Sequence, residues 1–273
     1  MKKFTFKRQL LFVMLMLLGC LSIQAADDGL ITNQVVINLD EPGTLPQKIS
    51  ASDKYLITNL KVKGDINGTD LGFLREMAGQ SINGEDETDG KLSTLDLSDA
   101  KIVGGGEPYF NFNGGQEVYY SEYDKIGKNA FSCCNSLKNL TLPKDITSIE
   151  QSAFFGCTGL TSITIPSYVT SISKYAFWGC SSLTSIELPN SLTTIDEAAF
   201  RECTSLTSVT LTSNLTSIEI HAFIGCSQLK EVRYNVLDDL ATYIQTDHPE
   251  IVVDYDSNCD FKYYQNNKEI SND

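Results

Sequence analysis

The sequence is poor in the side chains on which most catalytic sites depend. Of its 273 residues only two are histidines, His221 and His248, and histidine is the usual general base at neutral pH. No G-x-S-x-G, Walker A or G-x-G-x-x-G motif is present, and the carboxylates are scattered along the chain. We therefore expect neither an enzyme nor a bound cofactor.

Positive charge is also scarce. The chain has 21 basic residues against 35 acidic residues, which gives a net charge of −14. Four of the basic residues lie among the first eight positions, so a mature chain without them has 17 basic residues and a net charge of −18. Such a chain repels phosphate backbones and anionic lipids, which disfavours binding to nucleic acid or to a membrane surface.

A hydrophobic run long enough to cross a bilayer is missing as well. The run from Leu10 to Ile23 has 14 residues, whereas a transmembrane helix needs about 20. Because basic residues precede it and the small residue Ala25 follows, the run is typical of a signal peptide over residues 1–25. The alternative is a lipoprotein box that ends at Cys20, with a lipid anchor on that cysteine. Either interpretation predicts an exported protein, secreted or held at the cell surface.

One repeated pattern dominates the middle of the chain. An alanine-phenylalanine pair recurs every 23 residues, and a cysteine follows each phenylalanine by three positions. The pairs are Ala130-Phe131, Ala153-Phe154, Ala176-Phe177, Ala199-Phe200 and Ala222-Phe223, and the cysteines are Cys134, Cys157, Cys180, Cys203 and Cys226. Self-similarity at such a period indicates a solenoid, in which each unit buries its apolar face against its neighbours.

One copy, Leu160 to Ser182, shows what each unit contributes. Alternation at Ile163 and Ile165 predicts a short strand, which Pro166 ends because proline cannot donate to a ladder. A second short apolar segment follows, and then a turn that carries the alanine-phenylalanine pair. Strands of successive units are expected to pair at about 4.8 Å per rung, because a lone unit is too small to fold.

The residue before each alanine-phenylalanine pair varies from copy to copy. It is Asn129, Ser152, Tyr175, Ala198 or His221. This variety predicts a position that faces solvent.

The spacing L-x-x-[LIV]-x-[LIV] is that of leucine-rich repeats. With the additional I-P-x-x-[VL]-T-S-I-x-x-x-A-F-x-x-C, as in Ile165 to Cys180, the chain resembles the BspA-type leucine-rich-repeat surface proteins of bacteria. The resemblance implies a leucine-rich-repeat solenoid, a curved right-handed stack of 23-residue rungs built mostly of short parallel β-strands, with a cap at each end. It also implies export to the cell surface and, as in some members of the family, binding to host or neighbouring-cell proteins, and it implies no catalytic residue.

The remaining segments are divided around this array. We expect an N-terminal cap with an irregular first repeat at 26–91, a repeat strand with an aromatic, glycine-rich insertion at 92–125, and regular repeats at 126–235. Residues 236–273 are expected to form a C-terminal cap or to begin a further block of repeats.

Local patterns predict the elements of these flanking segments. Helices are expected at 45–49, from 69 to 79 and at 237–244, a strand at 251–255, and hairpins around 113–115 and 266–267. The acidic stretch 85–89 lacks the spacing of an EF-hand calcium loop, so a solvated loop is expected there.

Aromatic residues gather in the insertion and on two rungs. The insertion contains Tyr109, Phe110, Phe112, Tyr119, Tyr120 and Tyr123. They either cover the exposed side of the first rungs or form a contact patch, because tyrosine offers a large area with a polar tip. Phe155 and Trp178 follow their rungs' phenylalanines and are expected to stack, as a shielded pair or as a contact site.

The chain has eight cysteines, which in an exported protein suggest disulfides. Cysteines stacked on successive rungs run parallel, however, so their Cβ atoms lie too far apart for a bond, and a straight column cannot surround zinc. We expect buried thiols that act as small apolar fillers. Cys133 and Cys259 remain as partners for each other or as free thiols.

The leading hypothesis is an exported, surface-associated solenoid that contacts extracellular or surface proteins, with adhesion as one form of that contact. The alternative is a carbohydrate-binding module in which the insertion's tyrosines or Trp178 stack against sugars. The candidate contact residues are the same in both cases.

Overall fold

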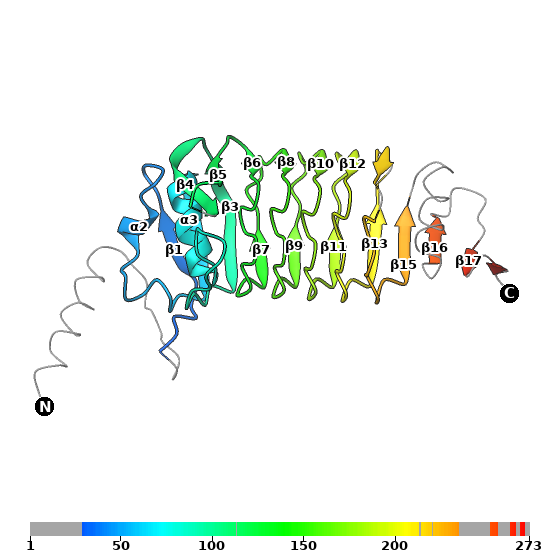
Figure 1. The fold of residues 1–273 in the computed structure, drawn as a ribbon, viewed down its shortest axis with the longest axis horizontal. Helices are drawn as coiled ribbons and strands as arrows, with labels where there is room; N and C mark the ends of the chain where they lie inside the picture. The colour runs from blue at the N-terminus through cyan, green and yellow to red at the C-terminus, as the bar shows by residue number, and fades with distance from the viewer. Residues whose placement is uncertain are drawn as a thin grey trace, which may run out of the picture.

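The structure is a computed structural model. It describes residues 29–234 apart from positions 113, 213 and 220, together with strands at 252–255, 263–265 and 268–270, and from residue 231 onward it describes the backbone alone. The elements are stacked side by side along one long axis, with the N-terminal elements at one end (Figure 1). The signal-peptide region with Cys20, the helix expected at 237–244, His248, Cys259 and the turn at 266–267 lie outside the described residues.

One long parallel sheet forms a side of the solenoid. Its nine strands follow the chain in order. They are β1 (Val35–Asn38), β2 (Asn59–Ile66), β3 (Thr94–Ile102), β7 (Asn139–Thr141), β9 (Ser162–Thr164), β11 (Ser185–Glu187), β13 (Ser208–Leu211), β15 (Glu231–Tyr234) and β16 (Val252–Tyr255). In the array, paired residues such as Asn139 and Ser162 are 23 positions apart. The predicted leucine-rich-repeat solenoid of short parallel strands is therefore confirmed.

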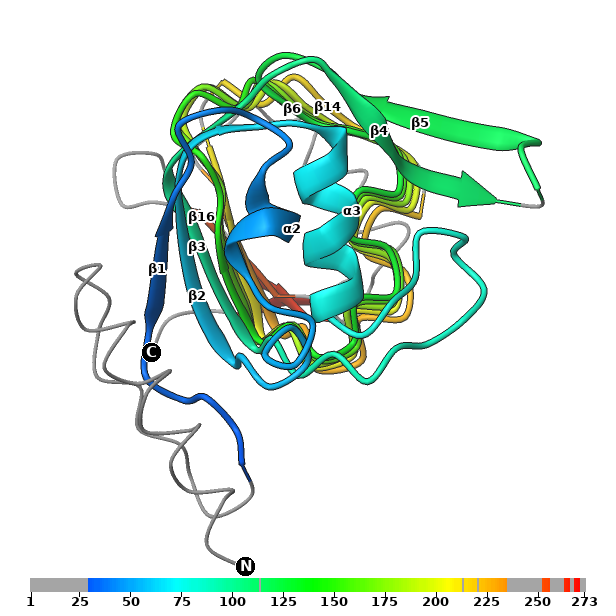
Figure 2. The same cartoon turned by 90° about the vertical axis from the view of Figure 1, so that its left-hand side faces the viewer.

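A second parallel sheet forms the adjoining side, from strands of only two residues. These are β6 (Lys125–Ile126), β8 (Ser148–Ile149), β10 (Ser171–Ile172), β12 (Thr194–Ile195) and β14 (Ser217–Ile218). The turns that carry the alanine-phenylalanine pairs close each rung on the remaining side, which we call the turn side. Viewed along the axis, the outlines of the rungs overlie one another (Figure 2).

The core of the array contains columns of identical side chains. The five phenylalanines of the repeats are stacked face to face, with successive ring centroids 5.7, 5.1, 5.2 and 5.4 Å apart. All five rings are buried. This spacing is close to the distance between strands, so each ring contacts the next without displacing a rung.

The cysteine column is buried beside the phenylalanines. The six described cysteines are free, and the five ladder thiols are buried, which confirms their role as fillers. Each thiol from the second rung onward also donates a hydrogen bond to the carbonyl of the preceding rung's phenylalanine, as Cys157 Sγ does to Phe131 O at 2.9 Å. Burial raises the pKa of Cys134 to about 12, so this thiol stays protonated.

Each rung contains two residues with left-handed backbone. The first precedes the alanine-phenylalanine pair, with φ between 53° and 63° in all five rungs. The prediction that this position faces solvent was wrong as a general rule, because Ala198 is only 3% exposed there and His221 alone of the five residues is exposed. The residue types vary because this position requires the left-handed backbone conformation and not a particular side chain. Hydrogen bonds between rungs hold that conformation.

The second left-handed residue precedes the ladder cysteine. Three of the five rungs have glycine here, whereas the first has Cys133 (φ 57°) and the fourth has Glu202 (φ 59°). A residue with a Cβ atom pays about 1–2 kcal/mol in this conformation. In both cases the backbone N–H donates to the carbonyl of the next rung, and this bond fixes the strained conformation.

The N-terminal unit covers the first rung with two helices. Helix α2 (Leu45–Lys48) and helix α3 (Gly68–Met77) lie across the end of the core (Figure 2), where helices were predicted. Asn67 and Asp70 form a capping box at the start of α3. The Asp70 carboxylate also accepts hydrogen bonds from the backbone N–H groups of Gly43 and Leu45, and so ties α2 to α3.

The aromatic insertion is a hairpin that projects past the outline of the rungs (Figure 2). Strands β4 (Gly105–Phe112) and β5 (Glu117–Ser121) pair antiparallel, as the glycine-rich turn between them predicts. At the other end of the molecule, β17 (Tyr263–Gln265) and β18 (Lys268–Ile270) form the second expected hairpin. The limits of the caps and of the array stay predictions.

Backbone hydrogen bonds between successive rungs form a ladder on the turn side, and the first rung of this ladder lacks donors from an earlier rung. In the first rung, the N–H groups of Asn129, Phe131 and Cys133 donate to carbonyls of the second rung at 3.1, 2.8 and 2.7 Å, and the pattern recurs along the array. The carbonyls of Lys128 and Ala130 have no earlier rung to supply their donors.

Two side chains from outside the array supply the missing donors. Tyr109 Oη donates to Lys128 O at 3.0 Å, and Arg75 Nη1 donates to Ala130 O at 3.1 Å and to Asn129 O at 2.6 Å. Burial raises the pKa of Tyr109, so its hydroxyl remains a donor. Arg75 is fully buried without a carboxylate partner among the described residues, and its guanidinium also lies 5.2 Å from the Phe110 ring centroid.

Candidate interaction surface

The structure divides the insertion's six aromatic residues into two groups. Tyr109 and Phe110 are 1% and 6% exposed and belong to the core, so their place in an exposed contact patch is corrected. Tyr109 is buried because its hydroxyl caps the turn-side ladder. Phe110 is buried because it packs on Arg75 and against Phe112 and Tyr119, whose ring centroids lie 6.3 and 5.6 Å away.

The other insertion aromatics are at least partly accessible. Phe112 and Tyr119 are half-buried, and Tyr120 and Tyr123 are 55% and 66% exposed. Lys128 Nζ lies 5.9 Å from the Tyr119 ring centroid and links the hairpin to the first rung. This segment therefore presents tyrosine side chains to solvent while its inner rings anchor it.

A second aromatic group lies on the turn side of the second and third rungs. Phe155 and Trp178 contact each other edge to face, with ring centroids 5.5 Å apart and planes at 72°. Tyr175 joins them, 5.1 Å from Trp178. Phe155 is 36% exposed, and the other two rings are half-buried. The expected contact between Phe155 and Trp178 is confirmed, but the rings meet edge to face and are not stacked. Sequence reasoning missed Tyr175.

Cationic side chains lie over these rings. The Arg201 guanidinium is 4.7 Å from the Trp178 ring centroid, a distance typical of a cation–π contact. Lys174 Nζ is 4.6 Å from the Tyr175 centroid and 2.6 Å from Glu197 Oε2, and its hydrogen bond lowers the pKa of Glu197. We call Phe155, Tyr175, Trp178 and Arg201 the Trp178 cluster.

The Trp178 cluster and the hairpin lie on the same flank. Lys128, beside the hairpin, and Lys174, beside the cluster, hold the same place in the first and third rungs. Two rungs correspond to about 10 Å. The two aromatic groups are therefore close enough for one partner to contact both.

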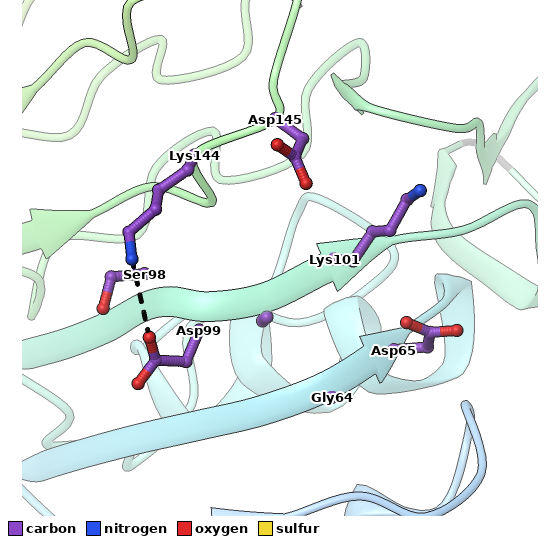
Figure 3. A pocket seen from close by; sticks show the side chains of 8 residues that line it. Gly64, Asp65, Ser98, Asp99, Lys101, Lys144 and Asp145 are labelled. Atoms are coloured by element: carbon purple, nitrogen blue, oxygen red, sulfur yellow. Dashed lines mark ion pairs between the residues drawn. The ribbon is translucent and has the colours of Figure 1, made fainter.

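A separate ionic depression of about 330 Å³ lies where β2 and β3 extend past the end of β7. Asp65, Asp99, Lys101, Lys144 and Asp145 line it (Figure 3). Lys144 Nζ lies 3.7 Å from Asp99 Oδ1, and a hydrogen bond from a further lysine, Lys61, lowers the pKa of Asp99. Lys101 Nζ lies 4.0 Å from Asp124 Oδ1, outside the depression, and the lining contains no histidine or thiol.

The described residues provide no metal centre and no general base in a cavity. No group of three histidine, cysteine or acidic side chains among them could hold an ion. In the acidic loop, Asn83 Oδ1 accepts hydrogen bonds from the backbone N–H groups of Glu85 and Asp86, which is ordinary loop geometry. His221 is exposed on its turn. Within the described part of the chain, no helix combines the length and apolar character needed to cross a membrane.

The period, the two sheets and the buried phenylalanine and cysteine columns agree with one family. The BspA type leucine-rich repeat region matches residues 124–247, in six copies. These residues are a BspA-type leucine-rich-repeat region. A repeat region of this type indicates a role in protein interaction. No curated protein matches the sequence.

Several solved structures of leucine-rich-repeat proteins are similar to this chain. A leucine-rich repeat protein of T. pallidum is 37% identical over 41% of this chain and 52% of its own, with a TM-score of 0.40. A leucine-rich repeat protein from Bacteroides ovatus is 21% identical over 74% of this chain and 55% of its own, with a TM-score of 0.43. A leucine-rich cell surface protein from Faecalibacterium prausnitzii is 19% identical over 70% and 67%, with a TM-score of 0.44. The chain thus spans about half the length of the first two.

Proposed function

We propose that the chain is an exported, surface-associated repeat protein that binds another protein, extracellular or on a cell surface, through the Trp178 cluster and the neighbouring hairpin. The observation that carries the proposal is the composition of the cluster. Tryptophan, tyrosine and arginine are the residues that most often dominate binding energy at protein interfaces. Here they stand together on one flank and are partly accessible.

The cluster is held in place before any partner arrives. The backbone of its rungs is fixed by the turn-side ladder, in which Gly156 N–H donates to Trp178 O and Gly179 N–H to Arg201 O. Its rings contact one another, and Arg201 covers part of Trp178. Such preorganisation lowers the entropy lost on association, so a modest contact area can support specific binding.

Export and adhesion complete the proposal. The first 25 residues have the charge and hydropathy pattern of a signal peptide, and the family's surface proteins act outside the cell. The mass of the mature N-terminus distinguishes cleavage after Ala25 from acylation of Cys20. A chain that retains its first residues unprocessed in the native host would contradict export.

Glycan binding is the second candidate, and the exposure of Tyr120 and Tyr123 favours it. A sugar stacks on a free aromatic face, whereas Arg201 already lies over Trp178. The hairpin is therefore the better place for a sugar. Retention of the protein on a glycan array that disappears with Tyr119→Ala and Tyr120→Ala would support this function.

The main test is capture of extracellular-matrix and serum proteins by the mature chain. Replacing both Phe155 and Trp178 by alanine is expected to abolish capture of a specific partner. Thr164→Ala is the matched control, because Thr164 is exposed on the opposite, sheet side of the solenoid. Capture that survives the double replacement but is lost with Thr164→Ala would move the site to the sheet and overturn the proposal.

A further inference from the structure

Arg201 presents an oriented and largely unused guanidinium. Its side chain is 36% exposed and is held over the Trp178 ring. Its one side-chain hydrogen bond to a described residue runs from Nε to Glu202 Oε1 at 3.5 Å, the long limit for such a bond. Within the described part of the chain, no acceptor is bound to its two terminal amino groups. A guanidinium in this state can still form the paired hydrogen bonds with which arginine binds a carboxylate.

Glu202 contacts Arg201 while its own backbone is in the strained left-handed conformation. It occupies the second left-handed site of its rung, where the rungs before and after it have Gly179 and Gly225. A glycine would relieve the strain, and the exposed pair formed between neighbouring residues contributes little stability in return. Strained backbone positions cluster at functional sites.

We propose that Arg201 receives a carboxylate of the partner protein and that Glu202 occupies this place in the free protein. The proposal rests on the proposed function and adds the chemistry of the partner. On binding, the partner's carboxylate takes the guanidinium fork and displaces the weak Glu202 contact. An apolar side chain next to that carboxylate packs on Phe155 and Trp178.

The overall charge of the chain restricts the partner further. A mature chain with a net charge of −18 repels acidic proteins at long range. The partner segment is therefore neutral or basic overall and presents a single carboxylate at the point of contact. Complementary charge then favours encounter, and the pairing with Arg201 fixes the register.

The single tryptophan of the chain makes the site directly observable. Trp178 is the only one, so a change in intrinsic fluorescence reports occupancy of the cluster. The probe is an array of basic peptides in which every sequence appears twice, once with a central glutamate and once with glutamine. Peptides that bind the mature full chain are then titrated in solution.

Three variants give the expected pattern. The natural chain binds glutamate peptides better than their glutamine counterparts, and Arg201→Lys removes this preference because it keeps the charge but loses the fork. Glu202→Gln keeps the left-handed residue but removes the competing carboxylate, so it tightens glutamate-peptide binding about threefold to fivefold. Thr164→Ala, on the opposite side, leaves binding unchanged.

The outcomes separate the two proposals. Equal binding of glutamate and glutamine peptides with a Trp178 fluorescence change would overturn the carboxylate inference and leave protein binding at the cluster intact. A glutamate preference that survives Arg201→Lys, or that Glu202→Gln does not strengthen, would also overturn it. If no peptide changes the fluorescence, and Phe155→Ala with Trp178→Ala does not alter protein capture, both proposals fail.

Discussion

The turn-side ladder has the same geometry inside the array and at its N-terminal end, but the donors differ in kind. Inside, each carbonyl receives a backbone N–H from a neighbouring rung. At the end, Lys128 O and Ala130 O receive side-chain donors from Tyr109 and Arg75. The comparison shows where residue identity matters. The array repeats a backbone conformation that Asn129, Ser152 or other residues can adopt, whereas its end depends on two individual side chains.

Replacing Arg75 should have the largest effect. Arg75→Met keeps an apolar side chain of similar length but leaves Ala130 O buried without its donor. An unsatisfied buried polar group costs about 1–3 kcal/mol. The lost contact with Phe110 and the lost hydrogen bond from Arg75 Nη2 to Ser81 O, 3.3 Å long, add to this. The free energy of unfolding should therefore fall by about 3 kcal/mol. Urea denaturation followed by Trp178 fluorescence measures the change.

The matched control for Arg75→Met is Arg201→Met, which removes a half-exposed arginine from the turn side. We expect it to change the free energy of unfolding by less than about 0.5 kcal/mol, as for most surface replacements. Similar effects of both substitutions would show that the end of the ladder needs no individual donor.

The hydroxyl of Tyr109 should matter less. Tyr109→Phe removes one oxygen and leaves the ring in place, so Lys128 O loses its donor while the packing persists. The expected loss is about 1–2 kcal/mol in the free energy of unfolding, measured in the same denaturation experiment. Tyr123→Phe is the control, since Tyr123 is 66% exposed. Equal stability of the Tyr109 variant and the natural chain would contradict the capping role.

The same comparison explains how far the sequence could predict the structure. The fixed spacing of the alanine-phenylalanine pairs was enough to predict the strands, their 23-residue register and the buried columns. The same local pattern recurs in every rung, so an assignment made for one rung holds for the next. Helix α3 was also predictable, from local capping signals around Thr69 and Asp70.

The end of the ladder and the Trp178 cluster were less accessible to prediction, because both depend on contacts between residues distant in the sequence. Arg75 meets carbonyls more than 50 positions away, and no local pattern identifies such a donor. Tyrosine is a residue type common in contact surfaces, so Tyr109 was expected in one. Its burial is explained only by the hydrogen bond that its hydroxyl donates at the end of the ladder. Tyr175 was overlooked because the variable left-handed position resembled a solvent-facing one, although its ring reaches Trp178.

The smallest effects should come from the left-handed positions, where conformation and identity can be separated. Glu202→Gly removes a strain of about 1–2 kcal/mol but makes the unfolded chain more flexible, which costs about 0.5–1 kcal/mol. The net result should be a gain of about 0.5–1 kcal/mol. Gly179→Ala is the reverse experiment, since an added Cβ would meet only Gly156, at 3.7 Å from its Cα and 3.8 Å from its backbone N. This substitution should lower the free energy of unfolding by about 0.5–1 kcal/mol.

A third variant isolates the backbone effect from the loss of a side chain. Glu187 is also an exposed glutamate, but it lies in strand β11. Glu187→Gly should therefore destabilise the chain by about 0.5–1 kcal/mol, opposite in sign to Glu202→Gly. If urea denaturation shows that both glutamate replacements destabilise the chain, the side-chain contacts of Glu202 outweigh its backbone strain. The identity of the side chain would then matter inside the array as it does at the N-terminal end of the ladder. Opposite signs mean that the array selects a conformation at this position and that the glutamate there is retained for a reason other than stability.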